Sequence, residues 1–442
     1  MGEIMCAIIV GIVAFVTLFL WFSRFLGESG VVSSAHPYMK WCCEKRWQPE
    51  TDDGKLTRQE AGSVFCQALI IRVVVYLLGT VICMLLSGYY SAQPRFSVSD
   101  FISSWNLWDS PHYIDLAKSG YQNCIENGEH LFLVFFPLYP WLIRAFHLFI
   151  SNWEVAAMVI STLAFCIGSV FFYGTIKEEY NTDIAKRSFW LLSIFPFSFF
   201  FGGIMTESLF FCLLSAGFFY IRRHKWLTAG IIGIFCALCR VQGILLLGVG
   251  LVEFFVAYQP GKMFREKKGK EFIKAFFTKG IWLFLMPVGN AIYLWINYKV
   301  SGNCFQFQIY QKEHWYHTTT WMSNSLAEIL THATDNAVEN SLKISTWYPE
   351  IVLFVLAIVL ILYALRRHPL KYTAFLIVYT AVNYSVTFLI SGGRYMACAL
   401  PMFVILAEWT QKKPKVYQAI VWISAMLFTV YFAGYMTGQQ IM

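Results

Sequence analysis

The segment "SSWNLWDSPHYIDLAKSGYQ", residues 103–122, concentrates side chains that can do chemistry directly after an apolar run. Asp109 stands between Trp108 and a Ser-Pro pair, so its carboxylate lies beside an indole that partly removes water from it. Such a carboxylate can accept a proton from a hydroxyl group. The alternative is that Asp109 caps a helix beginning at Pro111, because Asp before Ser-Pro is a typical helix start.

The helix expected after Pro111 brings further polar groups close to Asp109. His112 and Tyr113 fall on its first turn, and His112 and Asp115 share one face. A His-x-x-Asp pair can bind a metal, but two ligands without a third are a weak signal for one. We therefore expect a site that requires no metal and no other cofactor.

The rest of the chain consists of apolar runs that can cross a membrane. Of its 442 residues, 57% are hydrophobic and only 14% are charged. Lipid offers no partner for free backbone groups and no run alternates polar with apolar residues, so the spans should be helices. We expect an all-α, polytopic membrane protein with about 11–13 transmembrane segments. Residues 1–63 would supply an extra N-terminal helix and a cytoplasmic loop, and residues 64–442 the main module.

The net charge of +8 comes from Lys and Arg grouped in short blocks between apolar runs. This pattern is typical of cytoplasmic loops, so we expect membrane lipids and no nucleic acid as partners. Six blocks are expected in the cytoplasm: 40–58, 186–187, 222–225, 262–279, 366–371 and 412–415. The two large loops at 89–130 and 299–349 are then extracytoplasmic.

Three segments lie between basic blocks and must leave the cytoplasm and return. They are residues 188–221, 227–258 and 372–411. As one helix the first would extend about 50 Å at about 1.5 Å per residue, too long for a single pass through a core of about 30 Å. Their middles contain Glu207, Arg240 and Arg394, respectively. Three hairpin turns should therefore bring these residues to the face that carries Asp109.

The segment 131–150 does not fit this alternation. If it crossed the membrane, the basic pair at 186–187 would lie on the wrong side. Since Pro137 and Pro140 interrupt it, we expect it to lie in the interface or to re-enter without crossing.

Charged residues at the depth of the bilayer cost free energy, and they usually have a function. Alone, Arg240 or Arg394 could extend to phospholipid headgroups, and Glu207 could cap a hairpin. Two cations and two carboxylates that converge on one face from distant segments favour a shared site instead.

Several motifs carry a resemblance to a known family. They are "WDSPHYIDLAKSGY" (108–121), "FFPLYP" (135–140), "TES" (206–208), "CRVQG" (239–243) and "GGRYMACALP" (392–401). Together they resemble the PIG-V type mannosyltransferases, which add the second mannose in glycosylphosphatidylinositol assembly and have prokaryotic relatives. The resemblance begins at residue 64 and covers most of the chain from there, whereas residues 1–63 look like an addition.

The resemblance implies an inverting glycosyltransferase of the C superfamily that needs no metal for its chemistry. Its donor would be a polyprenyl- or dolichyl-phosphate mannose, or a related hexose, and its acceptor a glycolipid or another extracytoplasmic glycan. Asp109 would be the general base that deprotonates the acceptor hydroxyl. A prokaryotic plasma membrane is favoured as the location, with the endoplasmic reticulum as the alternative.

The remaining site residues are expected to bind substrate. Arg240 and Arg394 suit a lipid phosphate, and aromatic rings, Phe136 among them, can stack on sugar or isoprenoid. The expected substrate-binding residues are Trp108, His112, Tyr113, Tyr139, Glu207, Arg240, Gln311, Arg394 and Tyr395. Gln311 belongs to "QFQIYQKEHWYH" (306–317) in the second outer loop.

Other classes of protein stay open at this point. The sequence has no P-loop, Rossmann glycine fingerprint or Asp-x-Asp pair, so a nucleotide-sugar donor lacks its usual signatures. A multi-spanning transporter or flippase would instead show inverted repeats and broken helices that meet at mid-membrane. A non-catalytic lipid-binding subunit should tolerate Asp109→Asn.

Overall fold

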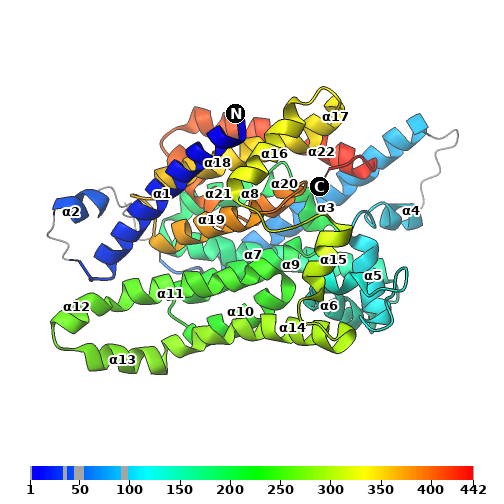
Figure 1. The fold of residues 1–442 in the computed structure, drawn as a ribbon. Coiled ribbons are helices and arrows are strands. Elements are labelled where there is room, and N and C mark those ends of the chain that lie inside the picture. The colour runs from blue at the N-terminus through cyan, green and yellow to red at the C-terminus, as the bar shows by residue number, and fades with distance from the viewer. Residues whose placement is uncertain (1, 33–36, 44–53, 91–97, 442) are drawn as a thin grey trace.

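The computed structural model describes residues 2–32, 37–43, 54–90 and 98–441. Every regular element in these ranges is a helix, which confirms the expected all-α class (Figure 1). Part of the basic block at 40–58 and part of the outer loop at 89–130 lie outside the described residues.

Long helices form the frame of the bundle. They are α1 (Gly2–Glu28), α3 (Arg58–Tyr90), α7 (Trp153–Glu179), α14 (Pro287–Ser301), α18 (Tyr348–Ala364) and α22 (Pro414–Met436). By length and composition, seven spans in the described part of the chain can cross a membrane: Glu3–Glu28, Arg58–Leu86, Trp153–Glu179, Val241–Arg265, Gly269–Ser301, Asn340–Ala364 and Pro414–Met436. The 11–13 segments expected from the sequence would require the shorter hairpin arms to be counted as well.

The three predicted hairpins are present as pairs of helices of 11 to 16 residues. Their arms are α8 (Thr182–Ser193) with α9 (Glu207–Arg222), α10 (Trp226–Cys239) with α11 (Leu245–Tyr258), and α19 (Leu370–Asn383) with α21 (Leu400–Thr410). The turns between them contain the 3-10 helices η2 (Ser198–Gly202) and η3 (Val241–Ile244) and the short helix α20 (Gly392–Met396). Proline and glycine in these turns interrupt the apolar runs that would otherwise continue as single helices.

Shorter elements cover the two ends of the bundle. One end carries α4 (Val98–Ser103), α5 (Ser110–Ser119), η1 (Leu131–Val134), α6 (Leu138–His147) and α15 (Gln306–His314) (Figure 1). The other end carries α2 (Pro37–Cys43), α12 (Pro260–Arg265) and α13 (Gly269–Thr278), and η4 (Gly280–Leu285) then leads into α14. The remaining elements are α16 (Met322–Thr334), α17 (Asn340–Leu342) and the π-helical turn η5 (Lys343–Trp347).

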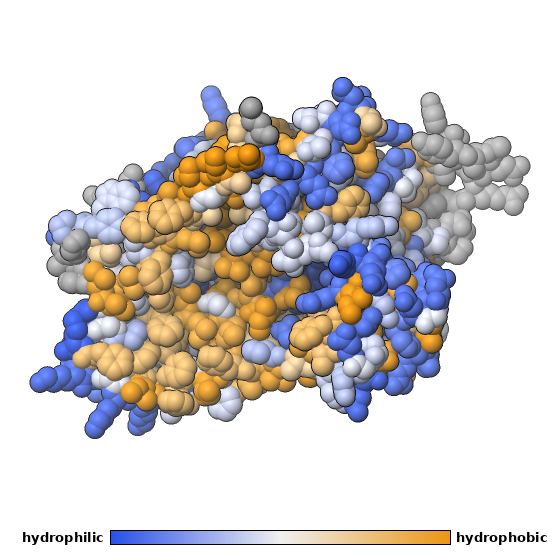
Figure 2. Space-filling view, viewed as in Figure 1, coloured by the Kyte–Doolittle hydropathy of each residue, from blue (hydrophilic) through white to orange (hydrophobic). Residues whose placement is uncertain are grey.

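The centre of the bundle is packed closely around α7. A Cβ atom at Gly168 of α7 would lie 2.8 Å from the Cα atom of Cys212 on α9, so the absence of a side chain lets these helices approach. Figure 2 shows hydrophobic residues across the middle of one face, with hydrophilic residues gathered towards both ends. This distribution is that of a protein whose middle lies in hydrocarbon.

Helix α6 and the residues after it support the expectation that the segment 131–150 does not cross the membrane. As α6 has 10 residues, it extends only about 15 Å at about 1.5 Å per residue, half of what a crossing needs. Leu148 and Phe149, which follow it, are 80% and 87% exposed. A short helix followed by exposed apolar side chains suits a position at the membrane interface.

Two of the predicted basic blocks, 222–225 and 366–371, meet at one end of the bundle. Arg222, at the last turn of α9, lies 3.7 Å from Glu179, and Lys371 of α19 lies 2.7 Å from the same carboxylate. Since α9 runs from Glu207 to Arg222, Glu207 lies about 22 Å from this basic end, at about 1.5 Å per residue.

Candidate active site

Asp109 occupies the position before α5 but does not cap this helix. Its carboxylate makes no hydrogen bond to the first turn of α5. Instead, Oδ2 of Asp109 accepts a bond of 2.6 Å from Nη1 of Arg394. Trp108 just before it has a φ of 56°, a left-handed conformation that is rare for a bulky residue. The capping alternative is therefore wrong, and a strained turn directs the carboxylate towards Arg394.

Glu207 links the two arginines behind Asp109. Its Oε1 accepts bonds of 2.5 Å from Nε of Arg394 and from Nη1 of Arg240. Glu207 is fully buried, and buried charges are tolerated when they are paired. The two guanidiniums and two carboxylates balance in charge. Residues from three hairpin turns and from the loop at 89–130 thus form one connected group, as the sequence predicted.

The local backbone places each charged residue of this group. Glu207 starts α9, where the helix dipole favours a negative charge, and Arg240 follows the end of α10, where it favours a positive one. The guanidinium of Arg240 also lies over the ring of Tyr395, 5.0 Å from its centroid. Arg394 projects from α20 in the third turn.

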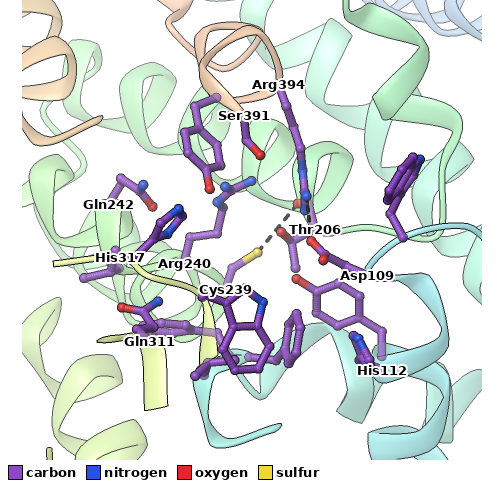
Figure 3. A pocket seen from close by; sticks show the side chains of 18 of the residues that line it. Asp109, His112, Thr206, Cys239, Arg240, Gln242, Gln311, His317, Ser391 and Arg394 are labelled. Atoms are coloured by element: carbon purple, nitrogen blue, oxygen red, sulfur yellow. Dashed lines mark hydrogen bonds and ion pairs between the residues drawn. The ribbon is translucent and has the colours of Figure 1, made fainter. Parts of the chain in front are cut away.

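These residues open into a cavity of about 400 Å³. Of the residues expected from the sequence, nine line it: Trp108, Asp109, His112, Tyr113, Phe136, Arg240, Gln311, Arg394 and Tyr395. In Figure 3, Asp109 and Arg394 lie on one side, Gln242, Gln311 and His317 lie on the other, and Arg240 lies between them. The cavity therefore brings a carboxylate, guanidiniums, amides and aromatic rings within reach of one ligand.

Two expected binding residues lie outside the lining of the cavity. Tyr139 is fully buried, and its hydroxyl lies 2.8 Å from Oγ of Ser161 on α7. Its ring packs edge to face against Tyr113, with centroids 5.4 Å apart. Tyr139 thus supports Tyr113, and Glu207 holds the two arginines from behind.

Several cavity residues were not expected from the sequence, and they come from the segment after α15 and from the second hairpin. Trp315 and His317 line the cavity, as does Gln242, whose Nε2 donates to Oδ1 of Asn383 at 2.9 Å. The only sequence signal was their presence in the motifs "QKEHWYH" and "CRVQG", which had already drawn attention to Gln311 and Arg240.

Backbone pairing holds His317 at the cavity. The amide of Thr320 donates to the carbonyl of Ser385, and the amide of Thr387 donates to the carbonyl of Thr318, each at 2.9 Å. Nε2 of His317 lies 3.2 Å from the carbonyl oxygen of Phe388. A carbonyl only accepts, so Nε2 carries the proton. Burial lowers the pKa of His317, which keeps the ring neutral at neutral pH and leaves Nδ1 without a proton.

Tyr113 and His112 complete the wall formed by α5. Burial raises the pKa of Tyr113, so its phenol stays protonated. The ring of His112 packs against Phe132, with centroids 4.7 Å apart. Among the described residues, no three His, Cys, Asp or Glu side chains lie close enough together to hold a metal ion. Metal independence stays a prediction.

Fold and site together define the class: a polytopic helical membrane protein with a charge-lined cavity at the end of the bundle away from its basic blocks. No family model and no curated protein matches the chain. Among solved structures, it is similar to the apo oligosaccharyltransferase of Archaeoglobus fulgidus, with 13% identity over 84% of this chain and 56% of that one and a TM-score of 0.43.

A second structure of the oligosaccharyltransferase AglB from this archaeon, in complex with an inhibitory peptide and a dolichol-phosphate, gives 12% identity and a TM-score of 0.42. It covers 84% of this chain and 56% of that one, so the chain spans about half the length of these proteins. At this level of similarity, the function of the chain has to come from its own site.

Proposed function

We propose that this protein is a membrane glycosyltransferase of the C superfamily. It transfers mannose, or a related hexose, from a polyprenyl- or dolichyl-phosphate to a hydroxyl group of a glycolipid or another glycan. The observation that carries this proposal is the Asp109 carboxylate, which is held by Arg394 in the same cavity that Arg240 lines.

Asp109 acts as the general base. Arg394 bonds Oδ2, and the Asp109 side chain is 27% exposed, which leaves Oδ1 for the acceptor hydroxyl. The proton moves to Oδ1 as the acceptor oxygen attacks the anomeric carbon. The bond from that carbon to the phosphate oxygen breaks on the opposite face, which inverts the anomeric centre. A positioned base of this kind contributes about 10²- to 10⁴-fold to the rate.

Arg240 is the better candidate for binding the lipid phosphate. Among the described residues, Arg394 donates hydrogen bonds to two carboxylates, through Nε and Nη1, whereas Arg240 donates only to Glu207, through Nη1. More of the Arg240 guanidinium is thus left to stabilise the charge that develops on the departing phosphate. Gln311 adds an amide to the cavity wall, and Trp108 adds an indole on which a sugar face can stack.

The cavity lies at the end of the bundle opposite the basic blocks, so the positive-inside rule puts it on the extracytoplasmic side. We assign the protein to a prokaryotic plasma membrane, with the endoplasmic reticulum as the alternative. A lipid-linked sugar fits this location, because its phosphate lies at the interface and its chain in the bilayer.

The test is sugar transfer by the purified protein. Supplied with labelled polyprenyl-phosphate mannose and a membrane extract, the wild type should label an acceptor. Asp109→Asn should lower this transfer by about 100-fold or more and leave donor binding intact. Asp115→Asn is the matched control, because it makes the same change at an exposed position of α5, the helix that follows Asp109.

Two outcomes would contradict the proposal. Wild-type transfer by Asp109→Asn would rule out Asp109 as the general base, and the absence of transfer by the wild type would favour a non-catalytic subunit. Movement of labelled donor across a vesicle membrane without any labelled product would identify a transporter or flippase.

A further inference from the structure

The turn that carries Arg394 is docked on a buried carboxyl group of α18. Glu350 is only 1% exposed. Its Oε1 accepts a hydrogen bond of 2.6 Å from the backbone N–H of Gly392. The other oxygen, Oε2, has no hydrogen-bond partner among the described residues. This carboxyl therefore meets the chain at the start of α20, two residues before Arg394.

The two glycines of the turn make this contact possible. A Cβ atom at Gly392 would lie 1.8 Å from Oε2 of Glu350, so any side chain there would displace the carboxyl. A Cβ atom at Gly393 would lie 2.7 Å from the ring of Phe197. The backbone of the turn is thus held between Glu350 on one side and Phe197 on the other.

The position of this turn relative to Asp109 and Glu207 determines where the guanidinium of Arg394 lies. From α20, Arg394 reaches Asp109 at 2.6 Å and Glu207 at 2.5 Å. The next residue, Tyr395, accepts a bond of 2.8 Å at its carbonyl from the hydroxyl of Tyr379. A shift of Gly392 away from Glu350 would move the backbone of Arg394 relative to both carboxylates.

Stability alone does not explain a carboxyl at this place. Glu207 is equally buried but is paired with two guanidiniums. Among the described residues, Glu350 has only neutral partners, which are the backbone N–H groups of Gly392 and Gly393 and the hydroxyl of Tyr384. Hydrogen bonds to neutral groups contribute only about 0.5–1.5 kcal/mol each, so they do not offset the burial of a charged carboxylate as two guanidiniums do. A polar group that is expensive at membrane depth is usually kept for function.

We propose that Glu350 is a positioning residue for the transfer reaction. Its carboxyl accepts a hydrogen bond from the Gly392 N–H. This bond holds Arg394 in the position from which its guanidinium orients the Asp109 carboxylate. The catalytic part of this inference rests on the proposed function, whereas the link between Glu350 and Arg394 does not.

The kinetic test compares two substitutions of Glu350. Glu350→Ala removes the acceptor, so kcat should fall about 10- to 100-fold, as expected when a catalytic group shifts by about 1 Å. KM for the lipid-linked donor should change less than about threefold, because Arg240 keeps its bond to Glu207. Glu350→Gln keeps an oxygen acceptor for Gly392 and should restore kcat to within about threefold of the wild type.

Leu353→Ala serves as the control for packing around α18. Leu353 is buried on the same helix, one turn after Glu350, and its side chain has no polar atom. The substitution removes packing but keeps the acceptor of the Gly392 N–H, so this variant should keep wild-type kcat. Wild-type kcat in Glu350→Ala, an equal loss in Glu350→Gln, or an equal loss in Leu353→Ala would each overturn the inference.

A second measurement does not depend on any activity. Thermal unfolding in detergent is compared for Glu350→Ala, Arg394→Ala and the double variant. If Glu350 positions Arg394, both single substitutions remove the same contacts of Arg394. The decrease in Tm of the double variant should then be smaller than the sum of the decreases in the two single variants. Additive losses would overturn the link. If the wild type transfers no sugar, the proposed function fails. The unfolding comparison of the single and double variants then decides by itself whether Glu350 positions Arg394.

Discussion

Substitution of Glu207 by Gln tests whether the charges at the centre of the site are held by mutual pairing. Gln keeps the shape of the side chain and one oxygen acceptor but removes the charge that two guanidiniums share. Both bonds to Glu207 are 2.5 Å long, and Glu207 is fully buried. Removing one partner of a buried ion pair costs about 3–5 kcal/mol, because the remaining charge lacks compensation. We expect a loss of this size in the free energy of unfolding.

Glu266→Gln is a matched control elsewhere in the chain. Glu266 also stands between two cations, 4.0 Å from Lys262 and 3.4 Å from Lys268, but it is 43% exposed. Exposed pairs of this kind contribute about 0.2–1 kcal/mol, and salt screens them. The same chemical change should therefore cost several times less at Glu266 than at Glu207.

The assay is unfolding of both variants in detergent, followed by loss of helical signal at low and at high salt. High salt should weaken the already small effect of Glu266→Gln and leave the effect of Glu207→Gln unchanged. If the free energy of unfolding of Glu207→Gln lies within about 1 kcal/mol of that of the wild type, then buried ion pairing does not hold the site together.

Three further predictions concern the cavity. Burial lowers the pKa of His317, so the unfolded chain binds the proton more readily, and stability should fall as the pH drops below about 6.5. His317→Gln should flatten the thermal stability profile between pH 7 and pH 5, and an unaltered profile would contradict this. Arg240→Ala should weaken binding of polyprenyl phosphate by about 10- to 100-fold, the value of a charge-assisted hydrogen bond; unchanged affinity in a titration would argue against the phosphate role. Transfer should persist in EDTA, and activity that is lost in EDTA and restored by Mg²⁺ would identify a metal requirement.

The sequence alone was sufficient to predict which residues share the active end of the bundle. Helix length, hydropathy and the positions of Lys and Arg are local properties, and together they determine where a chain must turn back. From these properties Glu207, Arg240 and Arg394 were expected beside Asp109. The residue types of the first loop and the motifs of the resemblance supplied the other expected residues, and nine of the expected residues line the cavity. It also indicated that the segment 131–150 does not cross, in agreement with the short helix α6.

The partners of each residue depend on how the helices pack, and no local pattern records this packing. Asp109 is a typical capping residue by sequence, yet its carboxylate bonds Arg394, 285 positions later in the chain. Tyr139 belongs to the same motif region as Tyr113 but is turned away from the cavity to Ser161. Glu350 lies in the first turn of α18, whose sequence is that of an ordinary apolar transmembrane helix. Its contact with Gly392 exists only because α18 packs against α20. Local sequence thus determined which side of the bundle each residue reaches, and only the tertiary structure decided which groups meet there, because hydrogen bonds and ion pairs form over a few ångströms between segments far apart in the chain.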